Sequence, residues 1–253
     1  IAAVSVLGCD GGSNSTADNQ PSVPTSVRSG EATQVRTVRS NPTETPAAQV
    51  TRTPSAGQPP SGENGVLELD GFRDWVEVSG DKLSFSDSKF TILARVNLSG
   101  APGDAIFAKG SEVEAYAFFA RLISCAGAVG GAIDGKTFCS QLVIQQNAWV
   151  DAALSYDGKI GRFYVNGVTD EVPFGAKVPE RSGLGYIGFS PKGLTNEDFG
   201  GKIDFIGIYN GPRNFDQIRE DFADFNRRDY KVGQRQSQGL VALWTFDANF
   251  QDS

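Results

Sequence analysis

The sequence predicts an all-β fold, an antiparallel two-sheet jelly-roll sandwich with one short C-terminal helix. The 253-residue chain holds 30 glycines and 10% aromatic residues but no methionine. This composition is typical of short strands joined by tight turns. From residue 65 onward, apolar residues recur with a period of two between Asp-Gly and Asn-Gly pairs, the pattern of strands linked by hairpins. A hydrophobic content of 39% is enough for a sizeable core.

The alternation predicts ten strands before the helix, and so many in this span favour two stacked antiparallel sheets. We expect them at Val66–Leu69, Trp75–Val78, Phe90–Leu98, Ala105–Ala108, Tyr116–Ile123, Gln141–Ile144, Trp149–Tyr156, Gly161–Val165, Leu184–Phe189 and Lys202–Tyr209. The pairs Asp157-Gly158 and Asn166-Gly167 predict chain reversals, because these residues tolerate a positive φ.

The stretch RNFDQIREDFADF predicts the helix. Asn214 can cap the first turn together with Gln217, three residues further on. The apolar side chains that fall on one face, and should pack on the sandwich, are Phe215, Ile218, Phe222 and Phe225.

The final stretch, GLVALWTFDANFQDS, alternates again. Leu240, Ala242, Trp244 and Phe246 form one apolar face in this pattern. Residues 239–253 are either the closing strand of the domain or the start of a second repeat. Without such a strand, a sheet would keep an unpaired edge and an apolar stripe, which favours closure.

The first 64 residues differ from the rest. Residues 10–64 are rich in Ser, Thr, Pro, Gln and Ala and predict a disordered tether. Residues 1–9 end in Val6-Leu7-Gly8-Cys9, which resembles the lipobox of a bacterial lipoprotein signal. That resemblance implies lipidation of Cys9 and a lipid-anchored place on the bacterial cell envelope or outside the cell. The alternative is a terminus with a chance cysteine.

The other two cysteines, Cys125 and Cys139, lie in one compact segment and could form a disulfide, which leaves Cys9 as the odd cysteine. An exported compartment permits that bond. The alternative is two buried free thiols.

Charge and composition exclude several functions. The net charge is −7, and a surface of this sign repels nucleic acid and anionic membranes. The chain has no histidine, so neither a Ser-His-Asp triad nor a histidine metal site can form.

Several segments carry a family resemblance in their order: LELDGFRDWVEV, FTILARV, AIFAKG, YAFFARL, AWVDAALSYDGKIGRFYVNG, YIGF and GGKIDFIGIYNGPRNFDQIRED. Across residues 65–226 the chain resembles laminin G-like domains of the concanavalin A-like jelly-roll superfamily. The resemblance implies a twisted sandwich that binds glycans or proteins, without naming the ligand.

We expect the domain to be non-catalytic. Jelly-roll hydrolases carry carboxylates at alternate positions of one strand. Here Glu112 and Glu114 alternate, but Tyr116 stands where a third acid is needed. Two solvated glutamates at a strand start explain the pattern.

Two loops are candidate ligand sites. The turn with Phe72, Arg73 and Asp74 offers an aromatic ring and polar groups suited to a sugar ring. A loop further along the chain offers oxygen ligands from Asn196, Glu197 and Asp198.

The resemblance also implies one structural calcium ion, because many jelly rolls hold one near a sheet edge. Its candidate ligands are Asp70, the Gly71 carbonyl and Asp204, and Asp247 joins them if residues 239–253 close the domain.

These observations predict a lipid-anchored, non-catalytic surface module that binds a glycan or a surface protein. The alternative is structural: a subunit that self-associates in a surface layer or filament, or an interaction domain of a larger adhesin.

Overall fold

The computed structural model describes residues 65–72, 74–100, 104–110, 114–191, 198–227 and 238–246. All of them belong to the second of two units in the chain, residues 48–253. The predictions for residues 1–64, including Cys9 and the tether, lie outside the described residues. Within the described part, no helix combines the length and the apolar character needed to cross a membrane.

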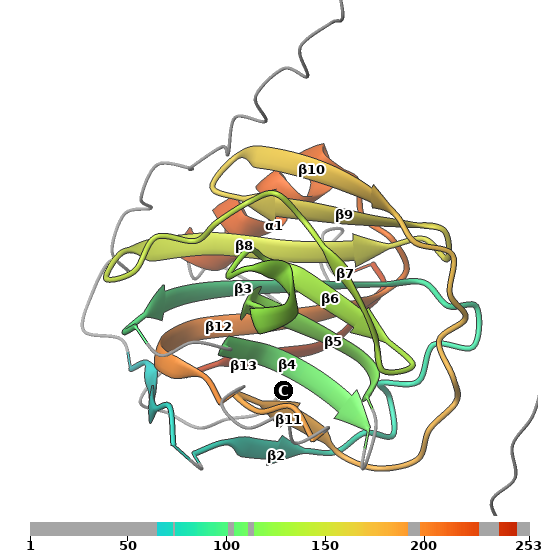
Figure 1. Ribbon diagram of the computed structural model, residues 1–253, viewed down its shortest axis with the longest axis horizontal. Coiled ribbons are helices and arrows are strands. Elements are labelled where there is room, and N and C mark those ends of the chain that lie inside the picture. Colours follow the sequence, from blue (N-terminus) through green and yellow to red (C-terminus); the bar gives the residue numbers. More distant parts are fainter. Residues whose placement is uncertain are drawn as a thin grey trace, which may run out of the picture. The chain divides into compact units, whose positions relative to one another are not determined.

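Two antiparallel sheets form a jelly-roll sandwich, and Figure 1 shows them lying one over the other. Sheet A has the order β1-β12-β3-β8-β9-β10, with β13 also paired to β12. Its strands are β1 (Leu67–Asp70), β3 (Phe90–Leu98), β8 (Trp149–Tyr156), β9 (Ile160–Val165), β10 (Val168–Pro173), β12 (Gly200–Asn210) and β13 (Leu240–Thr245).

Sheet B has the order β2-β11-β4-β5-β6-β7. Its strands are β2 (Val76–Val78), β4 (Asp104–Gly110), β5 (Glu114–Arg121), β6 (Gly130–Ile133), β7 (Lys136–Cys139) and β11 (Gly185–Ile187), and a short 3-10 helix, η1 (Ile123–Cys125), follows β5. The predicted fold class, all-β with a jelly-roll sandwich and one helix, is confirmed.

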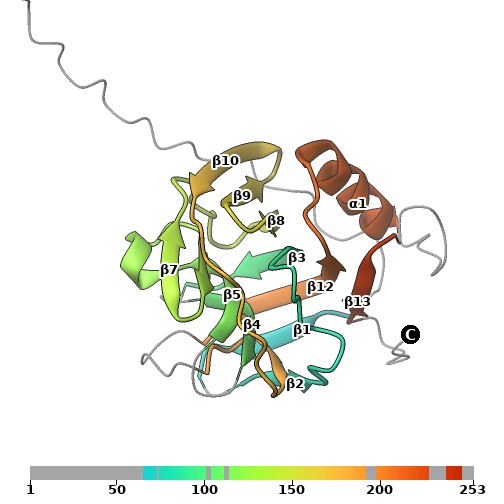
Figure 2. The ribbon, with the colours of Figure 1, turned by 90° about the vertical axis from the view of Figure 1, so that its right-hand side faces the viewer.

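The main core lies between the sheets because alternate side chains of each strand point inward. Phe90, Ile92, Tyr116 and Phe118 are among its fully buried members. A second core lies on the face of sheet A that is turned away from sheet B. There α1 (Phe215–Arg227) packs its apolar side chains, and Figure 2 shows α1 on the side of sheet A away from β4, β5 and β7. We call this face the outer face of sheet A.

Helix α1 begins as predicted. The Gln217 backbone N–H donates to Asn214 Oδ1 at 2.9 Å, and the Asn214 N–H donates to Gln217 Oε1 at the same distance. This reciprocal capping box satisfies two donors at the start of the helix. Of the four predicted apolar residues of the helix, Ile218, Phe222 and Phe225 lie in the second core, and the partly buried Phe215 packs against it.

One edge of β12 is covered by two strands placed end to end. β1 pairs with residues 200–203 of β12, and β13 pairs with residues 205–209. A strand in this place is what closure by residues 239–253 requires, and the deletion described in the Discussion tests it. A bulge opposite Ile208 and Tyr209 shifts the register, so Leu240 packs on the helix side whereas Trp244 faces the main core. The single apolar face predicted for both residues is therefore wrong.

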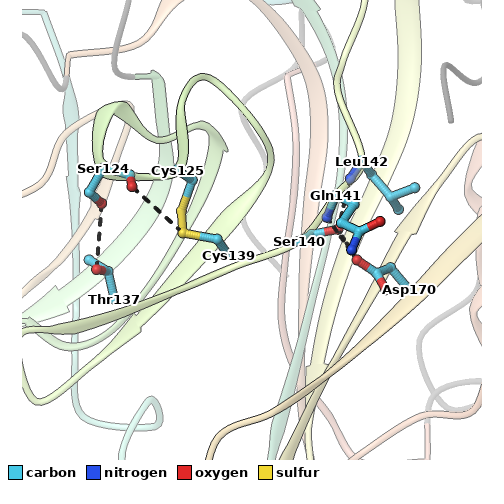
Figure 3. The surroundings of a disulfide bond; sticks show 8 residues. All are labelled: Ser124, Cys125, Thr137, Cys139, Ser140, Gln141, Leu142 and Asp170. Atoms are coloured by element: carbon cyan, nitrogen blue, oxygen red, sulfur yellow. Dashed lines mark hydrogen bonds between the residues drawn. A yellow bond between two sulfur atoms is a disulfide. The ribbon is translucent and has the colours of Figure 1, made fainter. Parts of the chain in front are cut away.

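The disulfide between Cys125 and Cys139 is confirmed, with a Cα–Cα distance of 5.3 Å. Figure 3 shows that it joins η1 to the end of β7. Directly after the bond, Ser140 Oγ and the Gln141 N–H both donate to Asp170 Oδ2 at 2.8 Å, which ties this segment to β10.

Candidate functional site

A pocket of about 790 Å³ opens where β1, β12, β3 and β8 meet. Its lining combines one aromatic ring, three carboxylates, one ammonium and two side-chain amides. The lining residues are Val66, Glu68, Leu69, Asp70, Asp74, Asn97, Ser99, Asn147, Trp149, Gly201 and Lys202.

The pocket lies on the outer face of sheet A. Val96, Leu98 and Val150 point into the main core, so the side chains that alternate with them, Asn97 and Trp149, point the opposite way. This is the face that carries α1, but the helix packs over other residues, such as Leu93 and Phe205.

Strand register sets four pocket residues side by side. Glu68 lies opposite Lys202, Lys202 opposite Asn97, and Asn97 opposite Trp149. Directly opposed residues of antiparallel strands keep their Cβ atoms about 5 Å apart. The row therefore presents an acid, a base, an amide and an indole across four strands. Lys202 Nζ lies 3.7 Å from Glu68 Oε2.

Glycines let the backbone form the next part of the wall. Gly201 has φ of 143°, and a Cβ there would lie 2.1 Å from the Asn97 carbonyl oxygen, so only glycine fits. Beside it, the Ser99 N–H donates to the Gly200 carbonyl at 2.9 Å, and the Asn147 N–H donates to the Leu98 carbonyl at 2.8 Å. These bonds hold the two polar residues at the rim.

The turn after β1 brings two predicted site residues to the pocket. Asp70 Oδ1 accepts the Phe72 N–H at 2.7 Å, and Gly71 has φ of 84°. Asp70 and Asp74 both line the pocket and are exposed. Phe72 is 69% exposed, but it does not line the pocket.

A buried charge cluster on the outer face of sheet A lies on the strands that also carry the pocket. Arg95 Nη1 donates to Asp151 Oδ1 and to Asn226 Oδ1 of α1, each at 2.9 Å. Asp204 Oδ2 lies 3.9 Å from Arg95 Nε. Burial raises the pKa of Asp151, and Arg95 offsets part of that rise. These contacts fix the helix end on the strands that form the pocket.

The predicted calcium ligands are only partly brought together. Asp70 lies opposite Gly200, whereas Asp204 lies four residues further along β12, beside Arg95. At about 3.3 Å per residue, that is a separation of about 13 Å along the strand. Across the described residues, no three His, Cys, Asp or Glu side chains are grouped to hold a metal. Asp247 lies outside the described residues, so the calcium site stays a prediction.

The other predicted site residues lie elsewhere. Arg73, Asn196 and Glu197 fall outside the described residues. Asp198 is half-buried just before β12 and does not line the pocket. The expectation that Glu114 is solvated is wrong. Glu114 is buried on β5, where Ser190 Oγ donates to its Oε1.

The prediction of site residues missed Trp149, Asn97, Asn147 and Lys202. One signal was available: Asn97 is a polar residue inside the apolar run FTILARVNL. The register that sets Asn97 between Trp149 and Lys202 joins strands far apart in the chain. Local patterns do not give such a register.

The solved structures that are similar to this chain include the following three. A Bacteroides ovatus protein with a proposed carbohydrate-binding role shares 17% identity at a TM-score of 0.48, covering 76% of this chain and 52% of that one. Domain 4 of a GH43 extracellular arabinanase from Geobacillus stearothermophilus, in complex with arabinotriose, shares 16% at 0.47, covering 61% and 75%. The CBM40 of the Ruminococcus gnavus IT-sialidase, bound to α2,3-sialyllactose, shares 13% at 0.49, covering 62% and 96%.

This chain spans about half the length of the Bacteroides ovatus protein. At such low identities the likeness concerns the fold alone. No curated protein matches the chain. A family model described as the concanavalin A-like lectin/glucanases superfamily matches residues 70–219, more than half of the sequence. The chain therefore belongs to the concanavalin A-like lectin/glucanases superfamily.

Proposed function

We propose that this protein is a non-catalytic surface module that binds a glycan in the pocket at the junction of β1, β12, β3 and β8. The observation that carries the proposal is the partly exposed ring of Trp149, which lies beside Asn97 in the wall of an open pocket. The apolar face of a sugar ring stacks on such an aromatic surface, and nearby amides and hydroxyls orient its hydroxyl groups.

The pocket suits binding better than hydrolysis. A glycosidase needs one carboxyl group that its surroundings keep protonated as a general acid. The three carboxylates of the pocket, Glu68, Asp70 and Asp74, are exposed, and Glu68 is paired with Lys202. A retained, unmodified glycan is the expected outcome.

A glycan array probed with the full chain tests the proposal. We expect Trp149→Ala to weaken binding to the best glycan about tenfold or more, because stacking and apolar burial are lost. Trp75→Ala is the matched control, since Trp75 is also partly exposed but stacks on Phe189 at 4.7 Å and does not line the pocket. Its binding should equal that of the unmodified protein.

Equal binding by the Trp149→Ala and unmodified proteins would contradict the assignment of the pocket. Repeating the array with calcium and with a chelator tests the predicted ion through Asp70. Concentration-dependent assembly without any glycan binding would favour the structural alternative.

For the location of the protein, we infer a lipid anchor at Cys9 on the bacterial envelope, joined to the domain by residues 10–64. Expression with an intact signal should place the unmodified protein in the detergent phase, and Cys9→Ala should release it. Equal partitioning of both proteins would rule the anchor out.

A further inference from the structure

The lining of the pocket is negatively charged. Three carboxylates, those of Glu68, Asp70 and Asp74, face a single cation among the described residues that line it, Lys202. That cation is already 3.7 Å from Glu68 Oε2. The two remaining carboxylates, on Asp70 and Asp74, lack a cationic partner among the lining residues.

These carboxylates come from a different wall than the ring. Asp70 ends β1 and Asp74 precedes β2, whereas Trp149 begins β8, with β12 and β3 between β1 and β8. Three strand spacings of about 4.8 Å separate the two walls, so an oligosaccharide stacked on the indole can place a further sugar unit at the acidic side. The cavity and the ring define the site independently of the acids.

An ammonium group fits this combination best. On the acidic wall, carboxylates form charge-assisted hydrogen bonds with a primary ammonium. A sugar acid would instead bring a like charge to the carboxylates of Asp70 and Asp74, which is unfavourable.

We propose that the pocket selects amino sugars with a free, protonated amino group over their N-acetylated counterparts and over sugar acids. This inference rests on the proposed glycan-binding function of the same pocket. Acetylation removes the positive charge and fills the space that the carboxylates would approach.

Isothermal titration of the full chain tests the selectivity with three probes: a glucosamine oligomer, the matching N-acetylglucosamine oligomer and a galacturonic acid oligomer. At a pH that protonates the amine, we expect the glucosamine oligomer to bind about tenfold more tightly than the acetylated one. The galacturonic acid oligomer should bind most weakly. Added salt should reduce the preference for the amine.

Two double variants separate the pocket charges from the net charge of the chain. Asp70→Asn with Asp74→Asn should bring the glucosamine affinity down to that of the acetylated oligomer, whose own affinity stays the same. Asn at position 70 keeps an oxygen to accept the Phe72 N–H. Asp216→Asn with Glu220→Gln removes the same charge from exposed positions on α1 and should leave the preference intact.

Each outcome decides between the two proposals. Equal, Trp149-dependent binding of the amino and acetylated oligomers would overturn the selectivity and leave glycan binding standing. If the preference for the glucosamine oligomer survives in the double variant of Asp70 and Asp74, or in Trp149→Ala, the oligomer is attracted by the net charge of the chain. That result would also overturn the selectivity of the pocket. If no oligomer binds, and no glycan binds on the array, both proposals fail.

Discussion

Asp221 shows how burial controls the charge of single side chains in this fold. It lies on α1 at 1% exposure, with Arg213 Nη2 donating to its Oδ1 at 2.7 Å. Burial raises the pKa of Asp221 from its ordinary value of 3.8 to about 6, although Arg213 acts in the opposite direction. Burial likewise raises the pKa of Asp104 and Asp151.

These shifts predict that stability increases as the pH falls from neutral through about 6 toward 4. In that window the folded state binds more protons than the unfolded state, so the free energy of unfolding rises on acidification. Urea unfolding across this range measures it. Asp221→Asn should flatten the slope, whereas Asp216→Asn, at an exposed position of the same helix, should not. Identical slopes in all three proteins would contradict the role of Asp221.

Single residues also show what the sequence can predict. The cap at Asn214 and the Cys125–Cys139 bond depend on neighbours close in the chain, and both are confirmed. The place of Trp149 in the pocket wall depends on strand register, which sets Asn97 opposite Trp149 and Lys202 opposite Asn97. Long-range pairing of this kind leaves no local pattern.

Among the elements, glycine-rich strands were the hardest to predict. β6 was missed because Gly130 and Gly131 have low strand propensity. The structure shows why glycine is needed: a Cβ at Gly131 would lie 2.5 Å from Phe138 Cζ, and one at Gly161 would lie 2.3 Å from Phe138 Cε2. The buried ring of Phe138 thus occupies the space that side chains at Gly131 of β6 and Gly161 of β9 would need.

One predicted strand is wrong. Leu142 and Ile144 are buried and alternate with more exposed residues, but residues 141–144 form no strand. Two of their backbone N–H groups donate to side chains: the Gln141 N–H donates to Asp170, and the Leu142 N–H donates to Ser140 Oγ. Side chains that bond the backbone locally compete with sheet formation. Like β6, the strands β7 and β10 were not predicted.

We expect the last strand, β13, to contribute to the stability of the domain. Deleting residues 239–253 should lower the free energy of unfolding by about 3–5 kcal/mol, because the burial of Trp244 and Leu243 is lost. The ring centroid of Trp244 lies 6.1 Å from that of Phe107. The melting temperature should fall by about 2–4 °C for each kcal/mol. Trp244→Ala should reproduce part of the loss, and Thr245→Ala, exposed on the same strand, should not.

If the truncated and full chains melt at the same temperature, residues 239–253 belong to a following domain. Circular dichroism of both proteins at matched concentration provides the measurement.

At the scale of the whole molecule, the sandwich, the helix and the family were predictable because they rest on period, turn residues and the order of motifs. The pocket was predictable only at one side, through Asp70 and Asp74. Its other walls come from β3, β8 and β12, which are distant in the chain and adjacent only in sheet A.

The central claim is that this pocket on the outer face of sheet A receives a glycan. Titrating the isotopically labelled full chain with the best glycan from the array, followed by NMR, tests it most directly. We predict that the indole N–H signal of Trp149 and the side-chain amide signals of Asn97 and Asn147 shift together with one affinity, while the indole signal of Trp75 stays in place. Shifts at Trp75, or at residues of sheet B, with unchanged signals from Trp149, Asn97 and Asn147 would contradict the account.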